Sequence, residues 1–240
     1  MNVMFELGAL RWPQVNAAPR RLLVVPTGSC EQHGPHLPMD TDTRIAVAVA
    51  SRACAGRPGT GLAPAVAIGA SGEHADFPGT LSIGTEALAL LLVELGRHAS
   101  LHWPAMLLVN GHGGNAAAID AARRRLRAEG RQCHVWHAGL PPTARAAGPD
   151  LPADPHAGRF ETSAMLALAP ELVRLDLAAP GDTRPLAQIM PQLRAGGVRA
   201  VSSSGVLGDP SGASAAEGER ILAALTTALA RAMDEILAAG

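Results

Sequence analysis

The sequence predicts an α/β fold, a three-layer α/β/α sandwich around a mostly parallel central sheet. Short apolar runs that suit buried strands alternate with longer stretches of helical periodicity. Polar clusters mostly follow the strands and precede the helices, where open α/β sheets gather ligands. Nearly half of the residues are apolar (48%), and no interior segment resembles a linker. We therefore expect residues 1–240 to form one domain.

The individual elements follow from periodicity and from residues that cap helices or break strands. The expected strands are short apolar runs at 22–26, 61–68, 104–109 and 133–137. Helical spacing predicts helices at 43–55, at 85–98, from the turn at 110–115 to about 129, directly after 156–163, and from 214 onward. The Pro-, Gly- and Ala-rich segment Leu140–Pro155 is either a lid or an ordinary surface loop.

Composition excludes several classes of function. The formal net charge of −1 does not indicate binding to nucleic acid or to an anionic membrane. No apolar run approaches the roughly 20 residues of a membrane span. Three widely spaced cysteines and the lack of a signal-peptide pattern favour reduced thiols in the cytoplasm. The chain has no Lys and no Tyr, which excludes a P-loop lysine, a lysine Schiff base and a tyrosine acid.

The segment 28–42 is the most informative part of the chain. It places two histidines and three carboxylates in fifteen residues, between a predicted strand and a predicted helix. Glu31 and His33 are two residues apart, so an extended backbone points both side chains the same way. Asp42 follows a Gly/Pro-rich loop that can fold back toward them. These residue types bind divalent zinc, iron and manganese, so we expect a metal site here.

A second polar cluster completes the predicted metal centre. His112 lies on a Gly-rich turn after a predicted strand. A carboxylate such as Asp42 can bridge two cations, with His112 and Glu31 completing one site and His33 the other. Two ions about 3.5 Å apart can share a hydroxide and hold an amide carbonyl oxygen. Amide hydrolysis without a covalent intermediate is therefore the expected reaction.

The third cluster supplies proton-transfer groups. His156 is free to deliver a proton to the leaving nitrogen, and Glu161 either orients it or binds metal. His36 is predicted to lie behind the ligands as a hydrogen-bond donor. The loop that carries Glu73 and His74 either faces the substrate or is a solvated loop.

Four motifs, at 28–42, 77–80, 110–115 and 156–163, stand in the order found in the creatininase (creatinine amidohydrolase) family, and the chain resembles that family over most of its length. The resemblance implies a three-layer α/β/α domain, a two-metal centre and a homo-oligomer. It also implies that His156, supported by Glu161, transfers protons or contacts substrate. The metal ligands that it implies, with Asp42 bridging, are Glu31, His33, Asp42 and His112.

The chain departs from the creatinine-hydrolysing members at two places. Those members carry a carboxylate ligand two residues after the equivalent of His112, where this chain has Gly114. Glu161 is the nearest candidate to replace it. They also have tryptophan just before the equivalent of His156, whereas Leu151–Pro155 has none, so creatinine is not the expected substrate.

Within the family the chain is most similar to members of the mycofactocin system. That resemblance implies a peptidase that cuts before the modified C-terminal Val-Tyr of a small precursor peptide, with Ser71, His74 and Arg159 as candidate substrate contacts. A formamide deformylase or a hydrolase of small cyclic amides remains the alternative. An inactive metal-binding scaffold fits less well with an intact His156/Glu161 pair. The ligand set does not separate Fe²⁺, Zn²⁺ and Mn²⁺.

Overall fold

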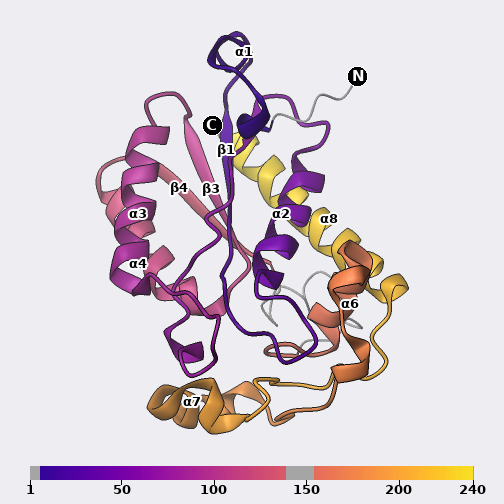
Figure 1. Cartoon of the computed structure of the whole chain (residues 1–240). Coiled ribbons are helices and arrows are strands. Elements are labelled where there is room, and N and C mark those ends of the chain that lie inside the picture. Colours follow the sequence, from indigo (N-terminus) through magenta and orange to yellow (C-terminus); the bar gives the residue numbers. More distant parts are fainter. Residues whose placement is uncertain (1–5, 139–153, 240) are drawn as a thin grey trace.

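Four parallel strands form the central sheet of the computed structural model, which describes residues 6–138 and 154–239 (Figure 1). Within these residues the strand order is β2-β1-β3-β4, and every neighbouring pair is parallel. In that order, the strands are β2 (Thr60–Leu62), β1 (Leu22–Thr27), β3 (Ala105–Asn110) and β4 (Gln132–His137). The predicted α/β class with a parallel sheet is confirmed.

Helices surround this sheet. The described α-helices are α1 (Trp12–Ala17), α2 (Thr41–Cys54), α3 (Gly84–Ala99), α4 (Ala116–Ala128), α6 (Arg159–Leu168), α7 (Leu186–Val201) and α8 (Ala215–Ala239). Short 3₁₀ turns connect them, among them η2 (Gly72–His74), η3 (Gly113–Asn115), η4 (Pro170–Leu172) and η5 (Leu175–Leu177). No described helix combines the length and the apolar character that crossing a bilayer requires.

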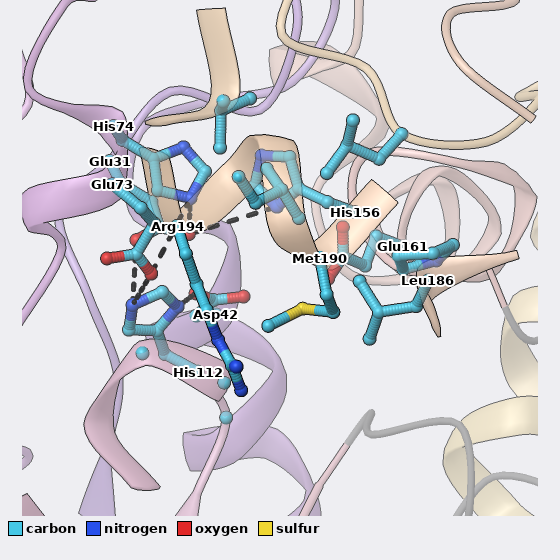
Figure 2. A pocket seen from close by; sticks show the side chains of 17 residues that line it. Glu31, Asp42, Glu73, His74, His112, His156, Glu161, Leu186, Met190 and Arg194 are labelled. Carbon is cyan, nitrogen blue, oxygen red and sulfur yellow. Dashed lines mark ion pairs between the residues drawn. The ribbon is translucent and has the colours of Figure 1, made fainter. Parts of the chain in front are cut away.

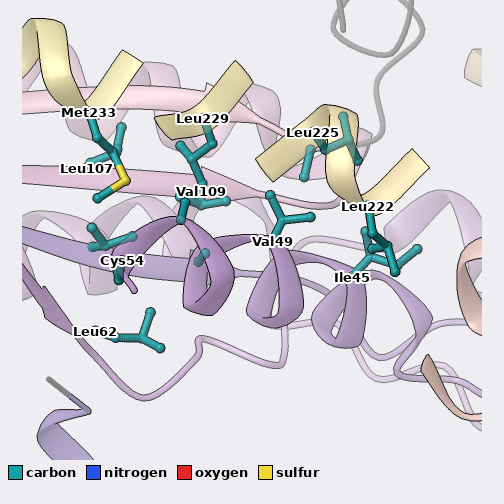
Figure 3. Packing of buried hydrophobic residues seen from close by; sticks show 14 of the residues in the cluster. Ile45, Val49, Cys54, Leu62, Leu107, Val109, Leu222, Leu225, Leu229 and Met233 are labelled. Atoms are coloured by element: carbon teal, nitrogen blue, oxygen red, sulfur yellow. The ribbon is translucent and has the colours of Figure 1, made fainter. Parts of the chain in front are cut away.

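The two faces of the sheet follow from the alternation of side chains along β1. Leu22 and Val24 point to one face, where they pack with α2 and α8, whereas Leu23 and Val25 point to the other, where they pack with α3 and α4. Figure 3 shows the first of these layers, with Val49 of α2 near Leu225 of α8. These four residues of β1 are almost completely buried. Strand β1 therefore lies in the middle layer of a three-layer sandwich, as predicted.

The strand expected at 61–68 is wrong in its length. Pairing with β1 runs only over Thr60–Leu62, and the Ala63 amide still donates to the Val24 carbonyl (2.9 Å). Pro64 has no amide hydrogen, so the ladder stops there and resumes only as a bridge at Val66.

Helix α7 was not predicted. Pro191 lies inside it, and Gly196 and Gly197 depart from helical backbone angles, with Gly197 at φ +68°. These breaks hide the apolar spacing that normally marks a helix. The lid hypothesis for Leu140–Pro155 concerns residues that, up to 153, lie outside the described part of the chain.

Candidate metal centre

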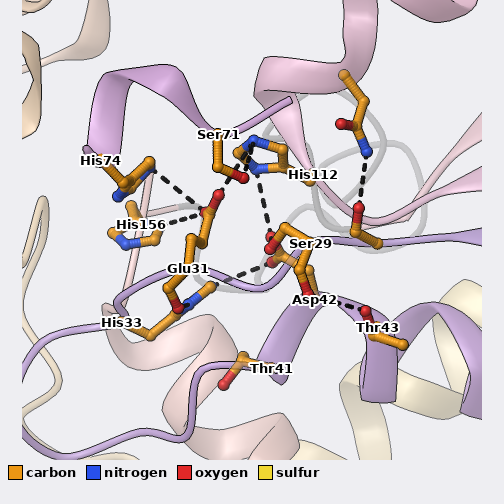
Figure 4. Close-up of polar contacts among 12 residues, drawn as sticks. Ser29, Glu31, His33, Thr41, Asp42, Thr43, Ser71, His74, His112 and His156 are labelled. Carbon is orange, nitrogen blue, oxygen red and sulfur yellow. Dashed lines mark hydrogen bonds and ion pairs between the residues drawn. The ribbon is translucent and has the colours of Figure 1, made fainter. Parts of the chain in front are cut away.

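The predicted site residues meet at the carboxyl ends of the central strands. The loop after β1 carries Glu31 and His33, the first turn of α2 carries Asp42, and the turn after β3 carries His112. His156 precedes α6, and Glu161 lies in the first turn of that helix. All of these side chains except His33 line one pocket of about 440 Å³ (Figures 2 and 4). A parallel sheet brings them together because its strands all end at the same edge.

Glu31 is a fully buried carboxylate, and neither of its oxygens accepts a hydrogen bond from any described residue. Instead, Oε2 lies 3.1 Å from His112 Nε2, while Oε1 lies 3.4 Å from His74 Nε2 and 3.8 Å from His156 Nδ1. A buried charge of this kind is costly unless a cation pairs with it. The residues present therefore fit a bound metal ion.

Asp42 lies between two groups of side chains that could bind metal ions. Its Oδ1 is 3.2 Å from His33 Nε2, and its Oδ2 is 3.3 Å from His112 Nδ1. Asp42 forms one compact group with Glu31 and His112 and another with His33 and Glu161. Ser29, which was not predicted to matter, donates from Oγ to Asp42 Oδ2 (2.7 Å) and fixes the carboxylate.

The carboxylates dominate the electrostatics of the site. Burial alone would lower the pKa of His33, but Asp42, Glu161 and Glu31 raise it to about 10. Burial likewise opposes the charge on His112, and Glu31 and Asp42 nevertheless raise its pKa well above the usual value. The carboxylates that make these histidines hold their protons would attract a divalent cation in the same way. Such a cation competes with the protons for the same ring nitrogens.

His156 differs from His33 and His112, the two histidines predicted to be ligands. Burial, together with the charges on His33 and His74, lowers the pKa of His156 well below its usual value, so the ring is neutral. Its Nε2 lies 2.8 Å from the Gln32 carbonyl oxygen and therefore donates to it. The unprotonated Nδ1 is then the atom that faces Glu31 and the pocket.

The remaining predicted residues have different surroundings. His74 lines the pocket, and Ser71 lies behind it with Oγ 3.5 Å from His112 Nε2. His36 is buried, and its Nε2 lies 3.0 Å from Thr162 Oγ1 rather than from a candidate ligand. Burial and the charge on His33 lower the pKa of His36 to about 4.

Arg159 does not line the pocket. Its Nε donates to Glu217 Oε2 (2.6 Å) and its second amino group to Glu217 Oε1 (2.9 Å), which joins α6 to α8. The guanidinium of Arg159 is thus engaged by Glu217 in this structure, and its contact with substrate stays a prediction.

Sequence reasoning missed the wall of the pocket that faces the carboxylates. That wall is one face of α7, on which apolar residues recur at intervals of three, four or five positions. An arginine side chain lies on the same face. The residues of this wall are Leu186, Met190, Leu193, Arg194 and Val198. Figure 2 shows Met190 and Leu186 reaching into the pocket near Glu161. The spacing was present in the sequence, although Pro191 obscured it.

An α/β sandwich with a buried cluster of histidines and carboxylates at its strand ends has the arrangement of a protein with a metal centre. The sequence profile described as creatinine amidohydrolase matches residues 8–233, and the chain belongs to the creatininase family. It is a metal-dependent amidohydrolase of that family.

Individual relatives cover most of the chain. A protein named mycofactocin precursor peptide peptidase from Mycolicibacterium smegmatis is 54% identical over 215 residues, which are 87% of this chain and 83% of that protein. One of the same name from Mycobacterium tuberculosis is 49% identical over 93% of this chain and 88% of that protein. The creatinine amidohydrolase of Pseudomonas putida is 32% identical over 98% of both chains. A solved structure described as "Creatininase Mn" superimposes with a TM-score of 0.78 at 30% identity, covering 97% of this chain and 98% of that one.

Proposed function

We propose that this chain is a metallopeptidase that removes the modified C-terminal Val-Tyr dipeptide from a mycofactocin precursor peptide. The observation that carries the proposal is identity of 49–54%, over most of both chains, to proteins named for that activity. The pocket supports it, because the ligand cluster faces an apolar helix wall that suits peptide side chains.

Two divalent ions are proposed for the site. Glu31, Asp42 and His112 would hold one, and His33, Asp42 and Glu161 the other, with Asp42 shared. Ions bound there would lower the pKa of water and polarise an amide carbonyl. Fe²⁺ and Zn²⁺ are our first candidates and Mn²⁺ the third, because the mixed nitrogen and oxygen ligands suit all of them.

His156 is proposed to move the proton that peptide cleavage requires. Its neutral ring presents an unprotonated Nδ1 to the pocket, while the Gln32 carbonyl holds the proton on Nε2. Nδ1 can therefore take a proton from the attacking water and deliver it to the leaving nitrogen. Glu161 accepts a hydrogen bond from the Ala157 amide (2.6 Å), which ties the His156 backbone to the first turn of α6.

The setting of the enzyme is proposed on the same grounds. We infer that the chain is one domain, that it works in the cytoplasm, and that it assembles as a homo-oligomer. The cytoplasmic proposal follows from Cys30, Cys54 and Cys133, which are free thiols in the structure. Gel filtration with light scattering measures the assembly directly.

The deciding experiment uses a precursor peptide whose C-terminal Val-Tyr has been modified by its radical-SAM enzyme. The iron- or zinc-loaded protein is incubated with this peptide, and the products are identified by mass spectrometry. Release of the modified dipeptide, abolished by a chelator and by Asp42→Ala, supports the proposal. An uncut peptide in the presence of bound metal rejects it and directs the search to formamides and small cyclic amides.

A further inference from the structure

The side-chain amide of Gln32 is held in one orientation by two backbone groups. Its Oε1 accepts a hydrogen bond from the Gly34 amide (2.8 Å), and its Nε2 donates to the Gly205 carbonyl (3.2 Å). A backbone amide can only donate and a carbonyl can only accept, so the oxygen and the nitrogen of this side chain cannot be interchanged. Gln32 is almost completely buried, and only glycine fits at position 205, because a Cβ atom there would overlap Gln32 Oε1.

The orientation of Gln32 determines which ring nitrogen of His74 carries the hydrogen. Gln32 Nε2 lies 2.9 Å from His74 Nδ1, and an amide nitrogen can only donate. His74 Nδ1 therefore accepts a hydrogen bond and carries no hydrogen, so the hydrogen of the neutral ring is on Nε2. Both hydrogens of the Gln32 amide group are then used, one by His74 and one by Gly205.

His156 also carries its hydrogen on Nε2, but it turns the other nitrogen toward the pocket. Its Nε2 donates to the backbone carbonyl oxygen of Gln32 (2.8 Å), which leaves Nδ1 with a free lone pair. The 3.0 Å contact between His156 Nε2 and Gln32 Nε2 joins two donors, and it is therefore not a hydrogen bond. Gln32 thus holds both rings, whose centroids lie 4.6 Å apart.

The N–H group of His74 has no acceptor among the described residues. Nε2 lies 3.4 Å from Glu31 Oε1 and 4.0 Å from Glu73 Oε1, but neither contact is a hydrogen bond. His74 is only 4% exposed, and it lines the pocket. A nearly buried donor without an acceptor is rare in proteins, and here it indicates that a bound molecule supplies the oxygen.

The same hydrogen excludes His74 as a metal ligand. His74 forms a compact group of possible ligands with Glu31 and Glu73, and Nε2 is the nitrogen that faces this group. A ring nitrogen binds a metal ion through its lone pair, which Nε2 lacks in this tautomer. The lone pair on Nδ1 is already occupied by Gln32.

Helix α7 fixes the loop that carries His74. Gly197 passes so close to the loop that a Cβ atom there would lie 2.8 Å from the Glu73 carbonyl oxygen. On the other side of His74, the Asp76 carbonyl accepts a hydrogen bond from Arg199 (3.0 Å). Because residues before and after His74 are held against α7, the position of its ring is built into the fold.

We propose that His74 Nε2 donates a hydrogen bond to the carbonyl oxygen of the peptide bond that is cleaved, and that Gln32 is the positioning residue that keeps the hydrogen on this nitrogen. His74 Nε2 and His156 Nδ1 lie beside the same oxygen, Glu31 Oε1, at 3.4 and 3.8 Å (Figure 4). A peptide bond bound there meets a donor for the oxygen that gains negative charge and an acceptor for the proton of the attacking water. The choice of substrate rests on the proposed function, whereas the position of the hydrogen does not.

The first test locates the hydrogen in metal-free protein with ¹⁵N-labelled histidine, because NMR distinguishes protonated from unprotonated ring nitrogens. The His74 and His156 signals are assigned by their absence from His74→Gln and His156→Gln. We expect hydrogen on Nε2 of both rings. Gln32→Met should give His74 a mixture of tautomers and leave His156 unchanged, since a backbone carbonyl holds its hydrogen. Gln132→Met, at an exposed position in β4, is the matched control and should match the wild type.

The second test compares His74→Ala with His74→Gln, whose amide nitrogen lies close to the position of the histidine Nε2. His74→Ala should lower kcat for precursor-peptide cleavage by about 10²–10³-fold, the usual effect of losing such a donor, with little change in KM. His74→Gln should recover part of this loss. Both variants should bind as much zinc as the wild type by elemental analysis. Unchanged melting of both metal-free variants separates loss of the donor from loss of the fold.

Three results would overturn the assignment. Hydrogen on His74 Nδ1 in the wild type contradicts the role of Gln32. Loss of zinc from both His74 variants makes His74 a ligand. Normal kcat in His74→Ala rejects the donor while the proposed peptidase stands, whereas a wild type that leaves the peptide uncut rejects the proposed function together with the substrate assigned to His74.

Discussion

The charge state of each histidine in this site is determined by the groups that surround it rather than by its residue type. His33, His112 and His156 are all almost completely buried, yet carboxylates raise the pKa of the first two, whereas burial and neighbouring histidines lower the pKa of the third. The same residue type, histidine, is thus a candidate ligand at positions 33 and 112 and a neutral proton carrier at position 156.

We predict that His156→Ala keeps its metal ions and loses turnover. His156 donates to the Gln32 carbonyl and points Nδ1 into the pocket, so its removal takes away proton transfer, which typically contributes about 10²–10⁴-fold in rate. The measurements are single-turnover peptide cleavage and metal content. Because His156 also forms a compact group with Glu31 and His33, loss of an ion from this variant would make it a ligand instead.

Ser29→Ala is expected to weaken metal binding, although Ser29 is not itself a candidate ligand. Ser29 Oγ donates to Asp42 Oδ2 (2.7 Å), and loss of a hydrogen bond that orients a ligand typically costs roughly 10–100-fold in metal affinity. Competition with a coloured chelator measures this change. Ser82→Ala, whose hydroxyl accepts from loop amides away from Asp42, is the control, and equal weakening in both variants would contradict the role of Ser29.

At the scale of elements, α7 determines what the pocket can hold. Its apolar residues form the wall opposite the ligands, and the rest of the helix fixes the η2 loop through Arg199 and Gly197. One helix therefore lines the pocket and also supports the loop that carries His74. An element that sequence reasoning missed thus forms one wall of the pocket.

Met190→Ala is expected to lower kcat/KM for the precursor peptide by roughly 5- to 20-fold, because it removes apolar contact area from the pocket wall. Metal content should not change. The control is Leu175→Ala, which removes an exposed leucine that does not line the pocket. Equal kinetics of Met190→Ala and the wild type would show that the peptide does not use this wall.

One carboxylate adds hydrogen bonds to the apolar contact between α6 and α8. Glu217 accepts hydrogen bonds from Arg159 and Ser163, and its amide is capped by Ser214 at the start of α8. Glu217→Gln should lower the free energy of unfolding by about 1 kcal/mol, because the buried Ser163 hydroxyl and the partly exposed Arg159 guanidinium lose a charged acceptor. Glu219→Gln is the control, since its pair with Arg52 is exposed and worth little.

The loss in Glu217→Gln should depend on pH. Burial opposes the charge on Glu217, but hydrogen bonds from Arg159 and Ser163 lower its pKa below the ordinary value of 4.5. A carboxyl with a lowered folded pKa stabilises the protein above its unfolded pKa, and this stabilisation is lost as pH falls through the folded pKa. Urea unfolding at pH 7 and near pH 4 should therefore give a smaller difference at the lower pH. A constant difference would mean that shape rather than charge is responsible.

At the scale of the whole molecule, the sequence sufficed wherever one local pattern determines the structure. Apolar runs gave β1, β3 and β4 to within a residue or two, and the family motifs gave the candidate ligands that the sheet edge brings together. Contacts between segments that lie far apart in the sequence could not be predicted from it. The pairing of Arg159 with Glu217 spans 58 residues, and the position of Glu73 beside Gly114 depends on how α7 packs against η2.

Removing the metal ions is expected to destabilise the whole domain, because the ligands come from loops after β1 and β3, from α2 and from α6. Each ion present at 100 times its Kd stabilises the folded state by about 2.7 kcal/mol, and each kcal/mol corresponds to roughly 2–4 °C for a chain of 150–250 residues. Chelation should thus lower the melting temperature by roughly 10–20 °C for two ions. Asp42→Asn, which removes the shared carboxylate, should melt at a temperature that no longer depends on added zinc. A wild-type melting temperature that ignores both chelator and zinc would show that the cluster does not bind metal in the folded protein.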